Sequence, residues 1–430
     1  MGRGRRSRLR GAADRLPQGA RPWHERRRDL RSPSRPPRRL MTSFAAADAA
    51  SRRSLMRARI ATLALFFVSG ASLGVWAAHI PLLKAGLALD DSTLGLVMLA
   101  MGTGALVAMP TTGALVHRFG AVRICVASGL FLGAVLALPP YAPHAPALGV
   151  AAFLIGLGVG GIDIAMNAHA AALERAWSRP IMSSIHAFFS IGGLAGAAGA
   201  AGLIALGAGA PFGMGAPALV LATTVAASGL WLRFADEEQA EPGLALRLPS
   251  RAVLALGLLA ICSFLCEGAV MEWSGVFLRD VTAAPLALAA GGYAAFSASM
   301  TVGRLLGDGF VHRLGAARAV QASGVIAAAA FAIVALAPDP WVAYAGLLLA
   351  GLGLANVVPP LFSAASRVPG VAPAAALAMV ASMGYGGGLV GPPLIGFLSD
   401  AVGLRFGFAL LAALAAAIAF GAMRTLARPG

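Results

Sequence analysis

The sequence predicts an all-α integral membrane protein with twelve transmembrane helices, arranged as two repeats of six helices. Composition supports the membrane assignment. The chain of 430 residues is 58% hydrophobic and only 12% charged, and from residue 58 onward most stretches of 18 or more residues are apolar and could cross a bilayer. Fifty-four glycines suit helices whose backbones pack closely, as association in lipid requires. A soluble globular fold is therefore excluded.

An internal repeat predicts the division into two units. Residues 116–129 read VHRFGAVRICVASG and return 195 positions later as VHRLGAARAVQASG at 311–324, with nine of the fourteen positions identical. At the same offset, Gly192-Gly193 aligns with Gly387-Gly388. Each copy of the motif is a short basic turn between long apolar runs, which places it in a loop between two membrane helices. Parallel repeats of this size are typical of transporter folds.

The apolar runs give the positions of the twelve spans. They fall at 59–82, 94–116, 121–140, 147–172, 181–205, 213–232, 252–278, 286–310, 316–336, 341–365, 373–398 and 404–424. We therefore expect an N-terminal six-helix half at 58–232, a charged linker at 233–251 and a C-terminal six-helix half at 252–430. Three cysteines, all inside predicted spans, form no disulfide or metal-binding motif, so we expect neither a cofactor nor a metal.

The net charge of +16 belongs mostly to the first 57 residues. They contain 17 Arg and 4 acidic residues, whereas the rest of the chain contains 17 basic and 14 acidic residues. Because this segment is rich in Arg and Pro without apolar periodicity, we expect residues 1–57 to form a disordered tail that attracts anionic lipids rather than nucleic acid. Met41 and Met56 are alternative starts, in which case the upstream residues are an over-extended gene prediction.

The distribution of basic residues predicts the orientation. With the amino terminus inside, the cytoplasmic segments collect the tail and most other arginines, while the outer loops keep only Lys84, Arg279 and Arg405. Cytoplasmic loops of membrane proteins carry such an excess of Lys and Arg. We therefore expect both termini and the linker in the cytoplasm.

This organisation resembles the major facilitator superfamily, whose basic turn reads Gly-x-x-x-Asp-Arg-x-Gly-x-x-Arg. The first copy here has Gly113, Arg118, Gly120 and Arg123 at those places, and His117 replaces the acid. The resemblance implies that such arginines gate the cytoplasmic side. A neutral His cannot hold a cation, so the family's usual ion pair at this gate is not expected.

The second copy of the turn has Arg313, Gly315 and Arg318, with Asp308 in place of the first Gly and His312 in place of the acid. We assign Arg313 and Arg318 to the same gating role. Further along the first half, IDIAMNAHAAALE at 162–174 and RPIMSSIHAFFSIGG at 179–193 resemble the YbjJ-type transporters of the bacterial inner membrane. That resemblance implies transport of a small solute by alternating access between the two halves.

Ionisable side chains inside a membrane span are costly unless they face water or a partner, so each one is a functional candidate. Asp163 lies within 147–172, and Asn167 follows one turn later on the same face. On the next span, His186 and Ser190 share a face at similar depth. We predict one polar cluster in which Asp163 and His186 handle protons while Asn167 and Ser190 contact the solute. A purely structural Asp163–His186 pair is the alternative.

In the second half, Glu267 lies near the middle of 252–278, and Glu272 lies a turn and a half further out. The resemblance implies that the first, fourth, seventh and tenth spans line the cavity, so Glu267 is the predicted counterpart of Asp163 in proton coupling. A buried carboxyl that only forms hydrogen bonds is the alternative. For Glu272 we consider a substrate-cavity position and a wetted outer vestibule.

Other polar residues complete the predicted cavity and gate. Ser72 and Trp76 share a face of 59–82 and could form a cavity wall, with an interfacial Trp as the alternative. Asn356 precedes two prolines that should kink its helix, where it could bind solute or another helix. Arg304 and Asp308, at i and i+4, are predicted to form a gate ion pair. Glycines on 181–205 and 373–398 should form surfaces along which the halves slide.

These observations favour a secondary transporter over an enzyme. The sequence has no HExxH or Gly-x-Ser-x-Gly motif, and Gly160-Gly161-Ile162-Asp163 lacks the Gly directly before Asp that intramembrane aspartyl proteases use. We expect a monomer that moves a small solute coupled to protons. A channel or a transport-inactive sensor on the same fold is the alternative. Without a central Lys or Arg among the cavity residues, a neutral polar solute, an amino compound or an amphiphilic cation is favoured over an anion.

Overall fold

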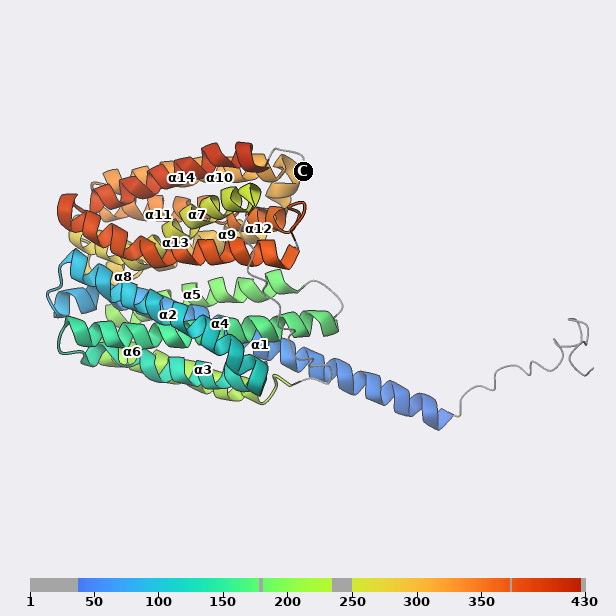
Figure 1. Ribbon diagram of the computed structural model, residues 1–430. Helices are drawn as coiled ribbons and strands as arrows, with labels where there is room; N and C mark the ends of the chain where they lie inside the picture. Colours follow the sequence, from blue (N-terminus) through green and yellow to red (C-terminus); the bar gives the residue numbers. More distant parts are fainter. Residues whose placement is uncertain (1–37, 178–180, 234–249, 372, 427–430) are drawn as a thin grey trace, which may run out of the picture. The chain divides into compact units, whose positions relative to one another are not determined.

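The computed structural model describes residues 38–177, 181–233, 250–371 and 373–426, and all regular structure among these residues is helical. Figure 1 shows long helices lying side by side. In the first half the helices are α1 (Arg38–Gly86), α2 (Asp91–Phe119), α3 (Ala121–Leu136), the 3-10 turn η1 (Pro139–Tyr141), α4 (Ala145–Trp177), α5 (Met182–Ala205) and α6 (Ala210–Gly229).

The second half begins with α7, which continues into one turn of π-helix. Its elements are α7 (Arg251–Val276), η2 (Phe277–Val281), α8 (Leu286–Ala290), α9 (Gly292–Leu314), α10 (Ala316–Leu336), α11 (Pro340–Leu354), α12 (Val358–Ala365), α13 (Pro373–Val402) and α14 (Leu404–Leu426). Among the described residues, 11 helical segments are long and apolar enough to cross a membrane. With the 30-residue α13, they confirm the predicted twelve-span fold.

The kink predicted at the double proline is present. α11 ends at Leu354 and α12 begins at Val358, with Pro359 and Pro360 in the first turn of α12. Proline is tolerated there because the first N–H groups of a helix have no partner within the helix. The span predicted at 341–365 is therefore two helices, and Asn356 lies in the break between them.

The two halves repeat each other in their contacts as well as in sequence. A methyl group at Gly156 of α4 would come within 1.8 Å of the Met101 carbonyl oxygen on α2, and one at Gly351 of α11 would come within 2.3 Å of the Phe296 oxygen on α9. Both members of the second pair lie 195 residues after their counterparts. Equivalent helices therefore pack through equivalent glycines.

The basic turn is the second repeated feature. Gly120 and Gly315 both follow a helix, with φ angles of 84° and 77°. Each glycine donates its N–H to the carbonyl of a valine four residues earlier, at 2.9 Å. A residue with a side chain is strained at such φ angles, whereas glycine is not. This explains why both copies of the motif have Gly at this position.

Most of the glycines on α5 and α13 pack within their own half, which corrects the prediction that they form sliding surfaces. Methyl groups at Gly192 and Gly196 would meet the carbonyl oxygens of Phe67 and Ala71 on α1 at 2.1 and 2.2 Å. In the second half, Gly387 approaches Ile261 of α7 in the same way. Gly193 is an exception, because it faces Tyr293 of α9 in the other half. Gly192 and Gly196 thus let α1 and α5 approach closely.

We expect Gly196→Ala to lower the free energy of unfolding by about 1–3 kcal/mol, because the new methyl group overlaps backbone atoms. Gly199→Ala is the matched control, since a methyl group there meets nothing within 4 Å. Thermal unfolding of both detergent-purified variants measures the difference. Equal melting temperatures for Gly196→Ala and Gly199→Ala would contradict the packing argument.

The structure bears on only part of the predicted disordered tail, residues 1–57. Residues 1–37 lie outside the described residues. Residues 38–57 are helical as the first part of α1, which corrects the prediction for this stretch. Its sequence contains AAADAA, and alanine is the strongest helix former.

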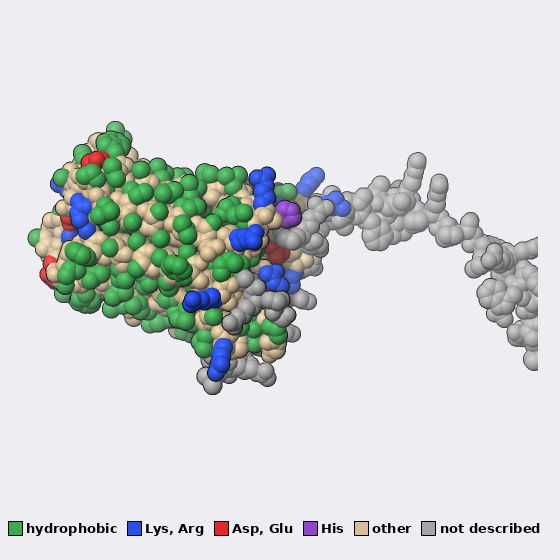
Figure 2. Space-filling model, turned by 90° about the horizontal axis from the view of Figure 1, so that it is seen from above, with side chains coloured by type: hydrophobic (Ala, Val, Ile, Leu, Met, Phe, Trp, Pro, Cys, Tyr) green, Lys and Arg blue, Asp and Glu red, His purple; other side chains and the backbone are tan. Residues whose placement is uncertain are grey.

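The lateral surface is apolar, as a protein in lipid requires. Figure 2 shows hydrophobic side chains over the middle of the molecule, with Lys and Arg gathered towards the ends. Highly exposed apolar side chains within the helices include Phe420, Leu305 and Leu219, at 75%, 70% and 67% exposed. In water, apolar side chains this exposed would be unfavourable, whereas lipid can cover them.

Candidate functional site

Asp163 lies midway along α4 and contacts both halves of the protein. The Asn167 side-chain amide donates to Asp163 Oδ1 at 3.1 Å and to the Asp163 carbonyl at 2.8 Å. From the second half, the Tyr385 hydroxyl of α13 donates to Asp163 Oδ2 at 3.5 Å. Asp163 and Asn167 are both partly exposed. The predicted pairing of Asp163 with Asn167 is thus present, and Tyr385 is a partner that sequence reasoning missed.

His186 does not join this group, which corrects the predicted single cluster. Its ring packs edge-on against Phe66 of α1, with ring centroids 5.0 Å apart, and the side chain is exposed. Among the described residues, His186 forms neither an ion pair nor a hydrogen bond with Asp163. The His186 ring therefore lies against α1 instead of joining the hydrogen bonds of Asp163.

A second polar group joins α5, α7 and α9. The Arg304 guanidinium donates to Ser190 Oγ at 2.8 Å and lies 3.5 Å from Glu267 Oε2. Ser263 Oγ donates to the other Glu267 oxygen at 3.3 Å. Because Ser190 belongs to the first half and the others to the second, this group also bridges the halves.

The Arg304 contacts correct one prediction. Arg304 pairs with Glu267; the Asp308 side chain lies outside the described part of the structure, so the Arg304–Asp308 pair stays a prediction. A central arginine is therefore present, contrary to the cavity inventory made from the sequence. Its charge is matched by Glu267, so it does not leave an unpaired cation that would attract an anionic solute.

Glu272 lies deeper in the protein than predicted. Its side chain is only 3% exposed, and its Oε2 has no hydrogen-bond partner. The outer-vestibule interpretation is therefore wrong for this conformation. A carboxyl so enclosed is costly to keep charged, and a solute has no access to it here.

Trp76 and Ser72 are also buried, which corrects the predicted cavity wall. They are 1% and 0% exposed, and the Ser72 hydroxyl donates back to the Val68 carbonyl at 2.9 Å. His79, further along α1, faces Gly213 of α6. The face of α1 that contains Ser72, Trp76 and His79 therefore points towards the interior of the first half. The opposite face of α1 has the glycines that pack on α5.

Asn356 forms a contact between helices. Its side-chain amide donates to the Gly303 carbonyl of α9 at 3.1 Å, and the residue is buried at 9% exposure. This favours the alternative that Asn356 joins two helices. It also satisfies a polar side chain next to the break before α12.

The four arginines assigned to gating are exposed at one end of the bundle. Arg118 and Arg123 flank the α2–α3 turn, and Arg313 and Arg318 flank the α9–α10 turn. Arg118 lies over the ring of its neighbour Phe119, 5.2 Å from the centroid. None of the four forms an ion pair with another described residue. The gating role of these arginines stays a prediction.

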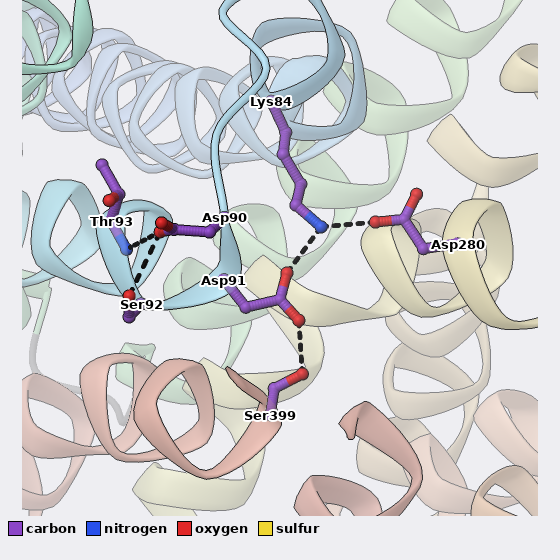
Figure 3. Close-up of polar contacts among 7 residues, drawn as sticks. All are labelled: Lys84, Asp90, Asp91, Ser92, Thr93, Asp280 and Ser399. Carbon is purple, nitrogen blue, oxygen red and sulfur yellow. Dashed lines mark hydrogen bonds and ion pairs between the residues drawn. The ribbon is translucent and has the colours of Figure 1, made fainter. Parts of the chain in front are cut away.

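An ion-pair network that the sequence did not predict lies at the opposite end, where α1 meets α2 (Figure 3). The Lys84 ammonium lies 2.5 Å from Asp91 Oδ1 and donates to the Asp280 carboxylate of η2. Ser399 of α13 donates to the second Asp91 oxygen. Lys84 and Asp91 belong to the first half, Asp280 and Ser399 to the second. We call these four residues the Lys84 network.

The Lys84 network is asymmetric with respect to the repeat. Arg279 is the position equivalent to Lys84, 195 residues later. Its guanidinium donates to the Ala284 carbonyl at 3.0 Å, within its own half. Only Lys84 of this pair crosses to the other half. The Lys84 and Asp91 side chains are 15% and 18% exposed, so water screens this pair less than a surface ion pair.

Asp90 precedes the network but has a different role. Its carboxylate accepts the Thr93 backbone N–H at 2.6 Å, which caps the start of α2. Hydrogen bonds from Thr93 hold the pKa of Asp90 below its usual value. Figure 3 shows Asp90 turned towards Ser92 and Thr93, away from Lys84. The adjacent Asp91 is therefore the acid that contacts the second half.

Three aromatic side chains of the second half lie together: Tyr385, which donates to Asp163, and its neighbours Phe264 and Phe362. Phe264 of α7 lies 5.4 Å from Tyr385 and 6.5 Å from Phe362 of α12, between ring centroids. Tyr385 is 44% exposed, and the other two rings are partly exposed. Sequence reasoning missed them because apolar side chains inside membrane spans are too common to stand out.

A groove lies away from these polar groups. Its volume is about 250 Å³, and it is lined by residues at the start of α2 and the start of α4, including Thr93, Leu96 and Pro146. Its lining contains no ionisable side chain and is far along α4 from Asp163. The described residues contain no group of three or more metal-ligating side chains.

Twelve helices in two matching sets of six, with polar groups joining the sets midway, define a membrane transporter of the two-repeat class. Residues 61–375 match the Major Facilitator Superfamily. The chain is 34% identical over 366 residues to an MFS-type transporter of Yersinia pestis, covering 85% of this chain and 94% of that protein. It is 35% identical over 366 residues to a transporter of Sinorhizobium fredii, covering 82% and 94%.

The fold also matches solved structures. The nucleoside transporter NupG superimposes with a TM-score of 0.66 at 15% identity, covering 87% of this chain and 100% of that one. The family match over residues 61–375 and the relatives above 30% identity show that the chain belongs to the Major Facilitator Superfamily, as a membrane transporter of that family.

Proposed function

We propose that this protein is a proton-coupled secondary transporter of a small solute, related to the YbjJ-type transporters of the bacterial inner membrane. It works by alternating access between its two six-helix halves. One observation carries the proposal. Each half supplies a partly buried carboxylate, Asp163 and Glu267, and each carboxylate belongs to a polar group that includes a residue of the other half. Relative movement of the halves would change the partners and hydration of both acids.

Proton coupling follows from that change of surroundings. A carboxyl group binds its proton more tightly in a dry, low-dielectric site than in water or beside a cation. When the halves separate around Asp163 or Glu267, each acid exchanges one environment for the other. The energy of a proton gradient could thereby be linked to movement of the solute.

The distribution of contacts supports a conformation closed at the Lys84 end. Gly95 and Gly102 of α2 approach Pro393 and Leu389 of α13 closely, and the Lys84 network lies at the same end. Further along, Gly113 of α2 has no atom within 4 Å of the position of an added methyl group. With the orientation predicted from the arginines, this conformation is closed to the outside.

Reconstituted vesicles test the proposed function. A thermal-shift screen of the purified protein identifies a ligand, and its labelled form is then offered to vesicles with and without an imposed pH gradient. We expect accumulation above the outside concentration only with the gradient. Equal uptake under both conditions would indicate a channel or uniporter, and binding without any uptake would indicate a sensor.

The orientation gives a separate prediction. We expect reporter fusions at the carboxyl terminus to report the cytoplasm, as do fusions in the linker 234–249, because arginines concentrate on that side. A fusion after Ala88, in the α1–α2 loop, should report the periplasm. A periplasmic carboxyl terminus would contradict both the orientation and the even number of spans.

A further inference from the structure

The chemical class of the transported solute can be inferred from the surroundings of Asp163, an inference that rests on the transporter function proposed above. Asp163 accepts hydrogen bonds only from the neutral side chains of Asn167 and Tyr385, and no Lys, Arg or His among the described residues lies within ion-pair distance of it. Its carboxylate is therefore without a counter-ion.

The other acids inside the bundle are matched or enclosed. Glu267 pairs with Arg304, and Glu174 accepts the backbone N–H groups of Ile181 and Met182 at 2.7 and 2.8 Å. Glu272 has an unpartnered oxygen, but it is only 3% exposed. Asp163 differs from Glu267 and Glu272 because it is both partly exposed and without a cation. It differs from Glu174 because its partners are side chains rather than backbone N–H groups at the start of a helix.

Aromatic side chains of the second half lie beside Asp163. Tyr385 touches Asp163 through its hydroxyl, so its 44% exposed ring lies at the junction of the two halves rather than against lipid. Phe264 and Phe362 continue the aromatic surface from Tyr385. The face of an aromatic ring attracts cations and also packs well against ring-shaped or aliphatic carbon skeletons.

We propose that the solute is an organic ammonium compound, a protonated amine on a small ring or aliphatic skeleton, bound between Asp163 and the rings of Phe264 and Tyr385. The carboxylate accepts hydrogen bonds from the ammonium group, and such charge-assisted bonds are stronger than neutral ones. The aromatic rings cover the carbon skeleton. An anion is excluded because it would meet the unpaired carboxylate of Asp163, while the guanidinium of Arg304 is already occupied by Glu267.

Binding of matched probes to the detergent-purified full chain tests this assignment. One set is phenethylamine, phenethyl alcohol and phenylacetate, and the other is cyclohexylamine, cyclohexanol and cyclohexanecarboxylate. Within a set, the skeleton is constant and only the charge changes. By isothermal titration near neutral pH, we expect each amine to bind at least about tenfold more tightly than its alcohol, and the carboxylates not to bind.

Variants identify the groups responsible. Asp163→Asn should remove the preference for amine over alcohol while the alcohol still binds, which shows that the variant is folded. Phe264→Leu and Tyr385→Leu should weaken the binding of both the amine and the alcohol. Tyr385→Phe, which keeps the ring, should weaken their binding much less. Glu272→Gln is the matched control, because that acid is enclosed, and it should leave binding unchanged.

The inference is overturned if the alcohols bind as tightly as the amines, if no amine binds at millimolar concentration, or if Asp163→Asn keeps the preference for amines. Equilibrium binding needs no gradient, so the result is independent of proton coupling. Selective amine binding with uptake that ignores the pH gradient would refute the coupling alone. Gradient-driven uptake of a neutral solute without any preference for amines would refute only the solute class.

Discussion

Asp163→Asn is expected to abolish uphill accumulation of solute while leaving exchange of labelled solute down its gradient. The asparagine amide oxygen can still accept from Asn167, and its NH2 group can donate to the Tyr385 hydroxyl oxygen, so both neutral partners of the native carboxylate keep a hydrogen bond. Local structure should therefore survive, while the exchangeable proton and the negative charge are both lost. Because that charge is also the proposed partner of an ammonium solute, exchange is measured at a solute concentration that saturates the variant. In vesicles with an imposed pH gradient, the ratio of inside to outside solute should fall to about one, the value without coupling.

Glu267→Gln should also uncouple transport, at a greater cost to stability. Glutamine cannot match the charge of Arg304, which lies 3.5 Å from the native carboxylate and is 32% exposed. We expect a lower melting temperature for this variant than for Asp163→Asn. Glu272→Gln is the control, because Glu272 has no charged partner and little exposure. If both Asp163→Asn and Glu267→Gln still concentrate solute, the acids are structural.

The sequence predicted the fold well because that fold depends on local properties. Apolar length determines the twelve spans, and the double proline at 359–360 determines the break between α11 and α12. The repeated turn required Gly120 and Gly315 for a backbone conformation that each turn adopts independently. None of these features needs knowledge of which helices are neighbours.

The site was harder to predict because it depends on how helices are rotated against one another. Helical spacing correctly placed Ser72 and Trp76 on one face of α1, but could not show that this face points into the first half. Spacing along α9 could not show that Arg304 reaches Ser190 of α5 and Glu267 of α7. Tyr385 lies 222 residues from Asp163 along the chain, and no local pattern links them.

The Lys84 network gives the second large expected effect. Lys84→Ala should shift the protein towards conformations open at the α1–α2 end, because it removes the cation that joins Asp91 of the first half to Asp280 of the second. The two acids would then repel each other across the closed junction. Breaking a fully buried ion pair costs about 3–5 kcal/mol. For this partly exposed one we expect about 1–3 kcal/mol, which corresponds to about 5–150-fold in the conformational equilibrium.

Spin labels at Ala85 and Ala401, both exposed and on opposite halves, would measure the shift in a background without the three native cysteines. We expect a longer-distance population to grow in Lys84→Ala and to shrink again in the charge-swapped Lys84→Asp/Asp280→Lys variant. Arg279→Ala is the matched control, because Arg279 occupies the equivalent repeat position but binds Ala284 within its own half. Identical distance distributions in Lys84→Ala, Arg279→Ala and the parent would mean that the close helix packing of α2 on α13, rather than the ion pairs, keeps this end closed.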